Sequence, residues 1–185
     1  MKYGFGVDLG GTTVKIAYFD ETGTMLDKWE IPTRRDNGGE NIIPDIADAV
    51  NRYRKEKNIA DTELLGIGIG VPGAVVNGVV NRCVNLGWGI VPIEEELSKL
   101  TGLPVKASND ANVAALGEYW VGGGKGSQNV IFITLGTGVG GGIILDGKLL
   151  NGTHGAGGEL GHMVLNSKET AICGCGKRGC VEQYC

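Results

Sequence analysis

An aspartate followed at once by a turn of glycine and threonine is the first feature of this sequence that can do chemistry. Asp8 ends a short apolar run, and Gly10, Gly11, Thr12 and Thr13 follow it closely. Backbone N–H groups and hydroxyls in such a turn can approach phosphate oxygens, and the carboxylate can hold a hydrated Mg²⁺. Taken alone, these residues are equally compatible with a plain hairpin turn.

A second glycine loop favours the phosphate interpretation. Residues 136–142, which include Thr137 and Gly138, also follow an apolar run, so the two loops form a weak internal repeat. Two apposed loops of this kind can clasp a nucleotide between two lobes. The sequence has no G-x-x-x-x-G-K-[ST] motif, and neither loop has the strand–loop–helix setting of a dinucleotide-binding fingerprint.

One histidine and three cysteines form a complete set of zinc ligands. His162, Cys173, Cys175 and Cys180 offer an imidazole and three thiolates, the Cys₃His set of closed, structural zinc sites. Glycines between the cysteines allow the backbone to wrap around a metal. Three reduced cysteines in an ordinary loop are the alternative. Cys83, outside this set, is interpreted as a small core residue.

A glutamate close to the histidine of this set is a candidate for contact with a hydroxylated ligand. Glu159 precedes His162 by three residues, so a single helical turn would place both on one side. A histidine bound to zinc through one ring nitrogen would keep the other as an oriented N–H donor. Elsewhere in the sequence, Asp110 follows Asn109 where a strand gives way to a helix. A surface glutamate and a zinc histidine without ligand contact are the alternative for the first pair.

Alternating strands and helices are expected to position these residues. Apolar runs between turns predict a three-stranded meander at the start, and helical spacing of apolar residues predicts a helix over 40–57. The strands are expected at 3–9, 13–20, 25–31, 64–71, 74–80, 105–108, 130–135 and 143–146, with further helices at 94–100 and 111–120. A glycine-rich joint after residue 120 predicts two domains, 1–120 and 121–185.

The composition excludes several classes of protein. Of the 185 residues, 42% are hydrophobic and 21% charged, which is typical of a globular and not a disordered chain. The net charge of −4 argues against nucleic acid or an anionic membrane as partner, and no apolar stretch is long enough to span a membrane. The 34 glycines indicate backbone brought close to a ligand. Five cysteines, an odd number, indicate reduced thiols and a cytoplasmic protein.

Five motifs stand in the order found in one known family. They are Asp8-Leu9-Gly10-Gly11-Thr12, Asn109-Asp110, Leu135-Gly136-Thr137-Gly138, Glu159-x-Gly161-His162 and Cys173-x-Cys175-Gly176-x-x-Gly179-Cys180-x-Glu182. Together they resemble the ROK (repressor, open reading frame, kinase) family of sugar kinases, and the whole chain resembles the N-terminal part of a bacterial member of the glucokinase type. The resemblance implies an α/β, actin-like ATPase fold of the ribonuclease H type, with the N-terminal lobe and the start of the second lobe.

The resemblance also implies roles for individual residues. Asp110 would be the general base that takes the proton from the sugar 6-hydroxyl as it attacks the γ-phosphorus of ATP. The remaining implied sugar contacts are Gly73, Asn109, Glu159, His162 and Glu182, and the implied phosphate and Mg²⁺ positions are Asp8, Gly10, Gly11, Thr12, Thr13, Thr137 and Gly138. ATP, Mg²⁺ and a structural Zn²⁺ are the expected cofactors. A hexose, ATP and further copies of the chain are the expected partners, without nucleic acid or membrane.

Substrate and class of function stay open at this level. Glucose is the first expected substrate, with N-acetylmannosamine, N-acetylglucosamine and fructose as alternatives, and a non-catalytic sugar-binding regulator of the same family is a second class. Such regulators carry a DNA-binding module ahead of the kinase-like region, and because Asp8 stands so near the start of the sequence, we expect no such module here. The sequence ends at Cys185 without an adenine-binding segment, so this chain alone is expected to be inactive.

Overall fold

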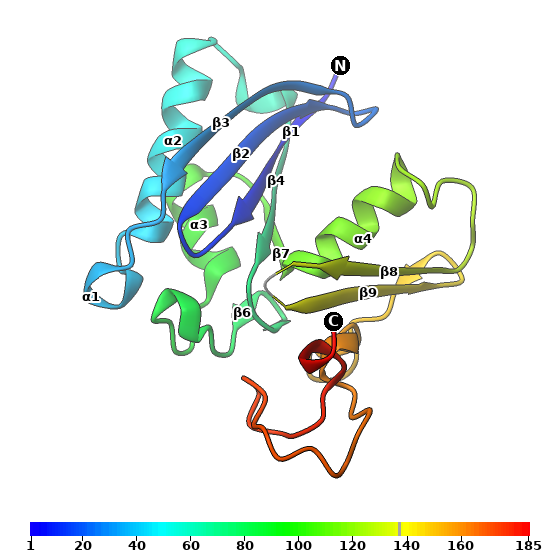
Figure 1. The fold of residues 1–185 in the computed structure, drawn as a ribbon. Helices are drawn as coiled ribbons and strands as arrows, with labels where there is room; N and C mark the ends of the chain where they lie inside the picture. The colour runs from blue at the N-terminus through cyan, green and yellow to red at the C-terminus, as the bar shows by residue number, and fades with distance from the viewer. Residues whose placement is uncertain (137) are drawn as a thin grey trace. The chain divides into compact units, whose positions relative to one another are not determined.

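Two compact units make up the computed structural model of the chain, which describes residues 1–136 and 138–185 (Figure 1). The first unit is Met1–Asp110 and the second is Ala111–Cys185. The sequence indicates a boundary near residue 120 instead. The difference arises because α4 (Asp110–Trp120) packs its small residues against the sheet of the second unit, so nearly all of this helix belongs to that unit.

A mixed sheet organises the first unit, with the strand order β3-β2-β1-β4-β7. The expected meander is confirmed, because β1 (Tyr3–Leu9), β2 (Thr13–Asp20) and β3 (Met25–Pro32) pair in antiparallel fashion. The strands β4 (Leu64–Val71) and β7 (Val105–Asn109) run parallel to β1. Parallel neighbours cannot be joined by a tight turn, so helical crossovers must connect them.

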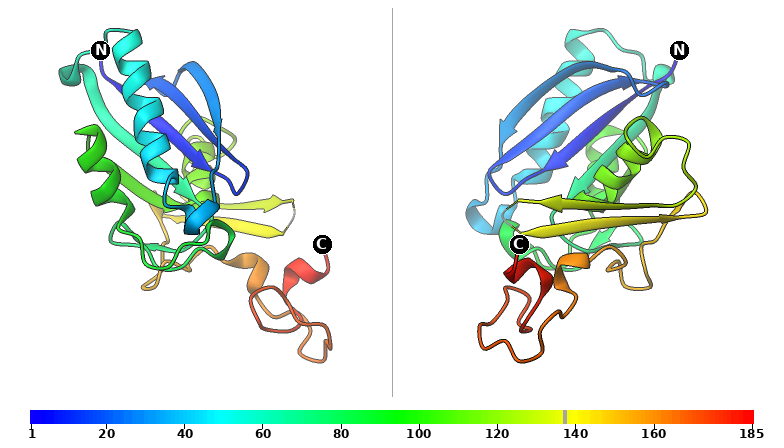
Figure 2. Two further views of the ribbon diagram at one scale, coloured as in Figure 1. Left: turned by 90° about the vertical axis from the view of Figure 1, so that its left-hand side faces the viewer. Right: turned by 45° about the vertical axis from the view of Figure 1, so that its right-hand side comes forward.

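Helices α2 (Ile42–Glu56) and α3 (Ile93–Thr101) provide these crossovers and pack side by side on one face of the sheet (Figure 2). They form because apolar residues recur at helical spacing along one side of each. The buried residues of this layer include Ile42, Ile46, Val50, Ile93 and Leu97 on the helices and Phe5, Val7, Leu9, Ile67 and Ile69 on the strands. The connections contain the short helices α1 (Asp36–Gly39), η1 (Asp61–Glu63) and η2 (Val84–Leu86). None of the helices described over 1–136 and 138–185 is long and apolar enough to cross a membrane.

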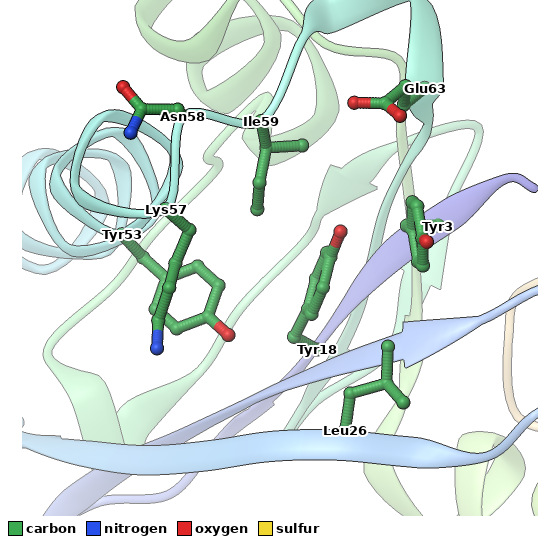
Figure 3. A pocket seen from close by; sticks show the side chains of 8 residues that line it. All are labelled: Tyr3, Tyr18, Leu26, Tyr53, Lys57, Asn58, Ile59 and Glu63. Atoms are coloured by element: carbon green, nitrogen blue, oxygen red, sulfur yellow. The ribbon is translucent and has the colours of Figure 1, made fainter.

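Aromatic rings gather where β1 begins. Tyr3 stacks on Tyr18 with ring centres 5.2 Å apart, and Tyr53 of α2 stacks on Trp29 at 4.4 Å. An open hollow of about 280 Å³ lies beside these tyrosines, and Figure 3 shows their side chains around it together with Lys57. The described residues that line this hollow include none of the site residues expected from the sequence. The expected residues on β1 lie toward the other end of that strand.

A tight hairpin replaces the single strand expected over 74–80. Here β5 (Val75–Val76) and β6 (Val79–Val80) pair in antiparallel fashion. Asn77 and Gly78 connect them with φ angles of 51° and 78°, and positive φ at both central residues is what a type I′ turn requires. An Asn-Gly pair between apolar residues is itself the sequence signal for this turn, so the single-strand prediction is wrong for a reason visible in the sequence.

Glu94 of α3 closes the outer edge of the sheet in the first unit. The edge strand is β7, and the N–H of Ala107 in this strand donates to Glu94 Oε1 at 2.8 Å. Glu94 Oε2 lies 3.2 Å from the ammonium of Lys106. A side chain therefore satisfies a backbone group that has no neighbouring strand to bond to.

A smaller antiparallel sheet organises the second unit, with the order β10-β9-β8 among the described residues. The strand β8 (Val130–Leu135) has the expected bounds, and β9 (Val139–Leu145) and β10 (Lys148–Leu149) follow. The prediction of a loop over 136–142 is wrong for residues 139–142, which belong to β9.

Close approach of α4 explains two of the three glycines in β9, Gly140 and Gly142. A Cβ atom added to Gly142 would lie 2.4 Å from the Cβ of Ala115, and one added to Gly140 would lie 3.2 Å from the Cβ of Ala111. A larger side chain at these places would push the helix away from the strand. These two glycines are therefore a packing requirement of α4, whereas Gly141 faces Leu160 and the Gly158 carbonyl, and none of the three is a sign of a loop.

Candidate functional site

The carboxyl ends of three parallel strands bring together the site residues expected in the first unit. The register pairs Asp8 of β1 with Gly70 of β4, and Gly70 with Ser108 of β7. Neighbouring strands are about 4.8 Å apart, so the backbones of Asp8 and Ser108 are separated by roughly 10 Å. The turn after β1, Gly73 after β4 and Asp110 after β7 therefore share one edge of the sheet, which is where parallel sheets bind ligands.

The turn after β1 presents backbone donors. The N–H of Gly10 bonds to the carbonyl of Thr13 at 3.1 Å, and Thr33 donates to the carbonyls of Gly10 and Thr12 at 2.7 and 2.9 Å. Among the residues that the structure describes, no protein acceptor takes the N–H of Gly11 or Thr12. The turn is thus fixed through its carbonyls and keeps two N–H groups for an anion such as phosphate.

Asp8 stands exposed beside this turn. Its Oδ2 atom lies 4.0 Å from the ammonium of Lys15, its partner in the β1–β2 ladder, and both side chains are largely in water. An exposed pair at this distance adds little stability and competes weakly with another cation. The Asp8 carboxylate is therefore accessible to a hydrated Mg²⁺.

Asn109 and Asp110 occupy the junction between β7 and α4. Asn109 is the last residue of β7 and Asp110 the first of α4, which confirms the expected strand-to-helix position of the carboxylate. Both residues are half-buried. The side-chain amide of Asn109 donates to the carbonyl of Gly73 at 3.5 Å, a long hydrogen bond that links the ends of β7 and β4.

Four candidate metal ligands meet in the second unit. The ligand atoms of His162, Cys173, Cys175 and Cys180 all lie within 4.8 Å of one another. The sulfurs of Cys175 and Cys180 are 3.6 Å apart, and the Cys173 sulfur lies 3.7 Å from His162 Nδ1. Bonds of about 2.3 Å to sulfur and 2.0 Å to nitrogen place the ligands of a tetrahedral zinc about 3.6–3.8 Å apart, so this set fits zinc.

His162 lies between two glutamates. It belongs to η3 (Leu160–His162), and its N–H bonds to the carbonyl of Glu159 at 3.1 Å, so the expected helical turn is confirmed. His162 Nδ1 lies 3.4 Å from Glu182 Oε1, and Nε2 lies 3.8 Å from Glu159 Oε2. Because Nδ1 faces the Cys173 sulfur, Nε2 is the nitrogen left to donate toward Glu159 or a hydroxylated ligand.

Hydrogen bonds set the acidity of the clustered thiols. The Cys173 thiol donates to Glu182 Oε1 at 2.8 Å, which raises the pKa of Cys173 to about 12. The N–H of Lys177 donates to the Cys175 sulfur and lowers the pKa of Cys175, whereas burial raises that of Cys180. Zinc binds thiolates, so its binding would expel the proton of Cys173 and release the carboxylate of Glu182.

Glu182, in η4 (Val181–Gln183), also lies beside the second glycine loop. A Cβ atom on Gly138 would come within 2.9 Å of Glu182 Oε2, and the Gly136 N–H bonds to the Gly138 carbonyl at 3.0 Å. Thr137, an expected phosphate contact, lies outside the described residues. The loop, the glutamates and the metal ligands are therefore neighbours within this unit.

The expected site residues thus form two groups, one in each unit. The first contains Asp8, Gly10, Gly11, Thr12, Thr13, Gly73, Asn109 and Asp110, and the second contains Gly138, Glu159, His162, Cys173, Cys175, Cys180 and Glu182. Two contacts at the edge of the first group are absent from the sequence predictions, those of Thr33 to the turn and of the Cys83 thiol to the Pro72 carbonyl. Each joins segments that are distant in the chain, so no local motif marks them.

Comparison with known proteins reveals extensive similarity. The model of the ROK family matches residues 4–185. The glucokinase of Halalkalibacterium halodurans is 46% identical over 179 residues, which cover 96% of this chain and 54% of that enzyme. The xylose repressor of Caldicellulosiruptor bescii is 33% identical over 97% of this chain and 45% of its own length. The crystal structure of a ROK family glucokinase from Streptomyces griseus with glucose and AMPPNP superposes with a TM-score of 0.82 at 38% identity, over 98% of this chain and 56% of that one.

Proposed function

Because the chain belongs to the ROK family, we propose that the protein carrying it is a sugar kinase that transfers the γ-phosphoryl group of ATP to the 6-hydroxyl of a hexose, with glucose as the first candidate. The fold is the α/β, actin-like ATPase fold of sugar kinases, as expected. The chain spans about half the length of the relatives it matches, so the proposal concerns the activity of the intact protein.

One observation carries this proposal. The phosphate-type turn after Asp8 and the junction carboxylate of Asp110 lie at the same edge of one sheet, two strands apart. Phosphoryl transfer requires an anion site and a proton acceptor near each other, and little covalent chemistry from the protein. A regulator that only binds sugar would need no proton acceptor at this place.

The proposed reaction is an in-line displacement. The carboxylate of Asp110 takes the proton of the sugar 6-hydroxyl while that oxygen bonds to the γ-phosphorus, and the bond from phosphorus to the bridging oxygen of ADP breaks. The N–H groups of Gly11 and Thr12 are free to hold phosphate oxygens in place. Mg²⁺, beside Asp8, would neutralise part of the phosphate charge.

Residues of the second unit are proposed to bind the sugar and the second side of the nucleotide. Glu159, His162 and Glu182 offer two carboxylates and a ring N–H, and carboxylates can accept from adjacent hydroxyls of a polyol. Zinc on the Cys₃His set would fix η3 and η4, and with them these side chains. This role of the metal is structural, since all four ligand positions come from the protein.

Two finer proposals concern substrate and location. N-acetylmannosamine, N-acetylglucosamine and fructose are the alternatives to glucose, because selectivity at one substituent depends on pocket shape.

All five cysteines lie within the described residues and none of them is in a disulfide, which supports a reducing, cytoplasmic compartment.

A substitution at Asp110 tests the proposed function. In the intact protein, Asp110→Asn should lower kcat for hexose phosphorylation by roughly 10² to 10⁴, because the general base is removed, while ATP affinity is retained. Coupled spectrophotometric assays with ATP, Mg²⁺ and each of the four sugars supply the measurement. Asp48→Asn, which removes an exposed carboxylate from α2, is the control and should leave kcat unchanged.

Two results would contradict the proposal. Wild-type protein that phosphorylates none of the four sugars would argue against a hexose kinase. An Asp110→Asn variant that keeps more than about a tenth of kcat would move the role of base to another carboxylate, with Glu159 the next candidate.

A further inference from the structure

The turn that follows β4 is held from behind by a second segment of the chain. The Gly73 N–H bonds to the Val71 carbonyl at 2.8 Å, which makes a three-residue turn centred on Pro72. A Cβ atom on Gly73 would lie 3.1 Å from the carbonyl oxygen of Arg82 and 3.4 Å from the Cβ of Cys83. The segment at 82–83 therefore packs directly against this turn.

Among the described residues of this segment, Cys83 alone donates a side-chain hydrogen bond to the turn. Its side chain is buried, with 2% of the residue exposed, and its Sγ donates to the Pro72 carbonyl at 3.0 Å. Thiol hydrogen bonds are weak in general, yet a buried carbonyl without a donor is costly. The thiol thus gives the Pro72 carbonyl a hydrogen-bond donor from within the protein.

The backbone of Cys83 is fixed independently of the turn. Its N–H and carbonyl exchange two hydrogen bonds of 3.0 Å with Trp88, and its carbonyl also accepts from Leu86 at 3.2 Å. The indole of Trp88 is buried and donates to the Gly39 carbonyl at 3.2 Å. The thiol therefore reaches the turn from a backbone that is itself held by hydrogen bonds.

The thiol keeps its proton at neutral pH. Burial raises the pKa of Cys83, and the negative charge of nearby Asp110 raises it further. A protonated thiol can donate, whereas a thiolate beside a carbonyl oxygen would repel it.

We infer that Cys83 is a positioning residue for sugar binding, which acts by holding the Pro72-Gly73 turn through its thiol. The Gly73 carbonyl accepts a hydrogen bond from the side-chain amide of Asn109. The turn therefore orients the Asn109 side chain, which is proposed to contact the sugar. This inference rests on the proposed function of Gly73 and Asn109. Loss of the thiol should weaken sugar binding while the phosphate turn after β1, on another strand, is unaffected.

Three variants of the intact protein test the inference. Cys83→Ala removes the donor and should raise KM for the sugar roughly threefold to tenfold, with kcat and KM for ATP changed less than twofold. Cys83→Ser keeps a donor on a shorter side chain and should recover much of this loss. Thr101→Val is the matched control, because it removes a buried hydroxyl that donates to the Leu97 carbonyl at the far end of α3, and it should leave KM for the sugar unchanged.

Hydrogen exchange without sugar separates the inference from the proposed function. Cys83→Ala should speed exchange of the Gly73 amide at least threefold, and Cys83→Ser should do so less. An unchanged Gly73 amide, or a sugar KM that shifts equally in Thr101→Val, would overturn the positioning role. If the wild type phosphorylates no sugar, the proposed function fails, while the exchange of Gly73 still decides whether Cys83 holds the turn.

Discussion

Adding one methyl group at Gly142 should destabilise the second unit through a clash with α4. The new Cβ would lie 2.4 Å from the Cβ of Ala115, whereas ordinary contact begins at 3.4 Å, so strand and helix must separate by about 1 Å. Overpacking of this kind costs about 2 kcal/mol, within a usual range of roughly 1–3 kcal/mol. Gly142 does not have a positive φ, so the cost comes from packing and not from the backbone.

A double-mutant cycle isolates this contact. Ala115→Gly alone should cost about 1 kcal/mol, because glycine is a poor helix former. If the two effects were independent they would sum to about 3 kcal/mol, but Gly142→Ala with Ala115→Gly should cost only about 1 kcal/mol, since the clashing carbon is gone. Urea unfolding of the intact protein, followed by circular dichroism, measures each value. Gly68→Ala, at a strand glycine with open space around it, is the control. Additivity within about 0.5 kcal/mol would refute the packing of α4 on β9.

The remaining predictions concern the metal and the aromatic cluster. The wild type should hold close to one zinc per chain, and Cys175→Ser should lose most of this zinc and bind sugar more weakly. Cys185→Ser, outside the ligand set, should keep both the zinc and the sugar affinity. Elemental analysis and sugar titration measure the two quantities, and zinc-free protein that binds sugar normally would contradict the role of the metal. Burial and the hydrogen bond to Asp27 raise the pKa of Tyr53 to about 12 from 10.0. The folded state therefore holds this proton more tightly, so stability present below pH 10 should fall as the pH rises from 10 toward 12. Tyr53→Phe should flatten that fall in urea midpoints measured at pH 9 and 11, and an unchanged slope would remove Tyr53 as the cause.

Local signals in the sequence predict most of the first unit. The alternation of apolar residues in β1 and β2, with glycines between them, depends only on neighbours in the chain, so their bounds are correct. The same holds for the junction at Asp110, where a β-type run meets strong helix formers. Turns and periodicity are properties of a few consecutive residues, and the sequence displays them directly.

Features that depend on distant segments escape this reasoning. The glycines at the start of β9 have low strand propensity, and only the approach of distant segments, α4 at Gly140 and Gly142 and residues 158–160 at Gly141, explains why they occupy a strand. Thr33 reaches the Gly10 turn because β3 pairs with β2, and Cys83 reaches Pro72 because two connections pack together. The candidate zinc ligands are different, since their residue types and spacing define the set before any fold is known.

The carboxylate of Glu94 at the margin of β7 has a consequence for the behaviour of the molecule at high concentration. An exposed edge strand is a template on which a strand from another molecule can add, because its outward N–H and carbonyl groups seek partners. At Ala107 the outward N–H is already bonded, and the bonded atom carries a negative charge that repels an incoming carbonyl oxygen. Lys106 adds a second charge to the same margin. One glutamate thus occupies an outward N–H of this five-stranded sheet and opposes growth of the sheet from molecule to molecule, which is the first step toward fibrous aggregates.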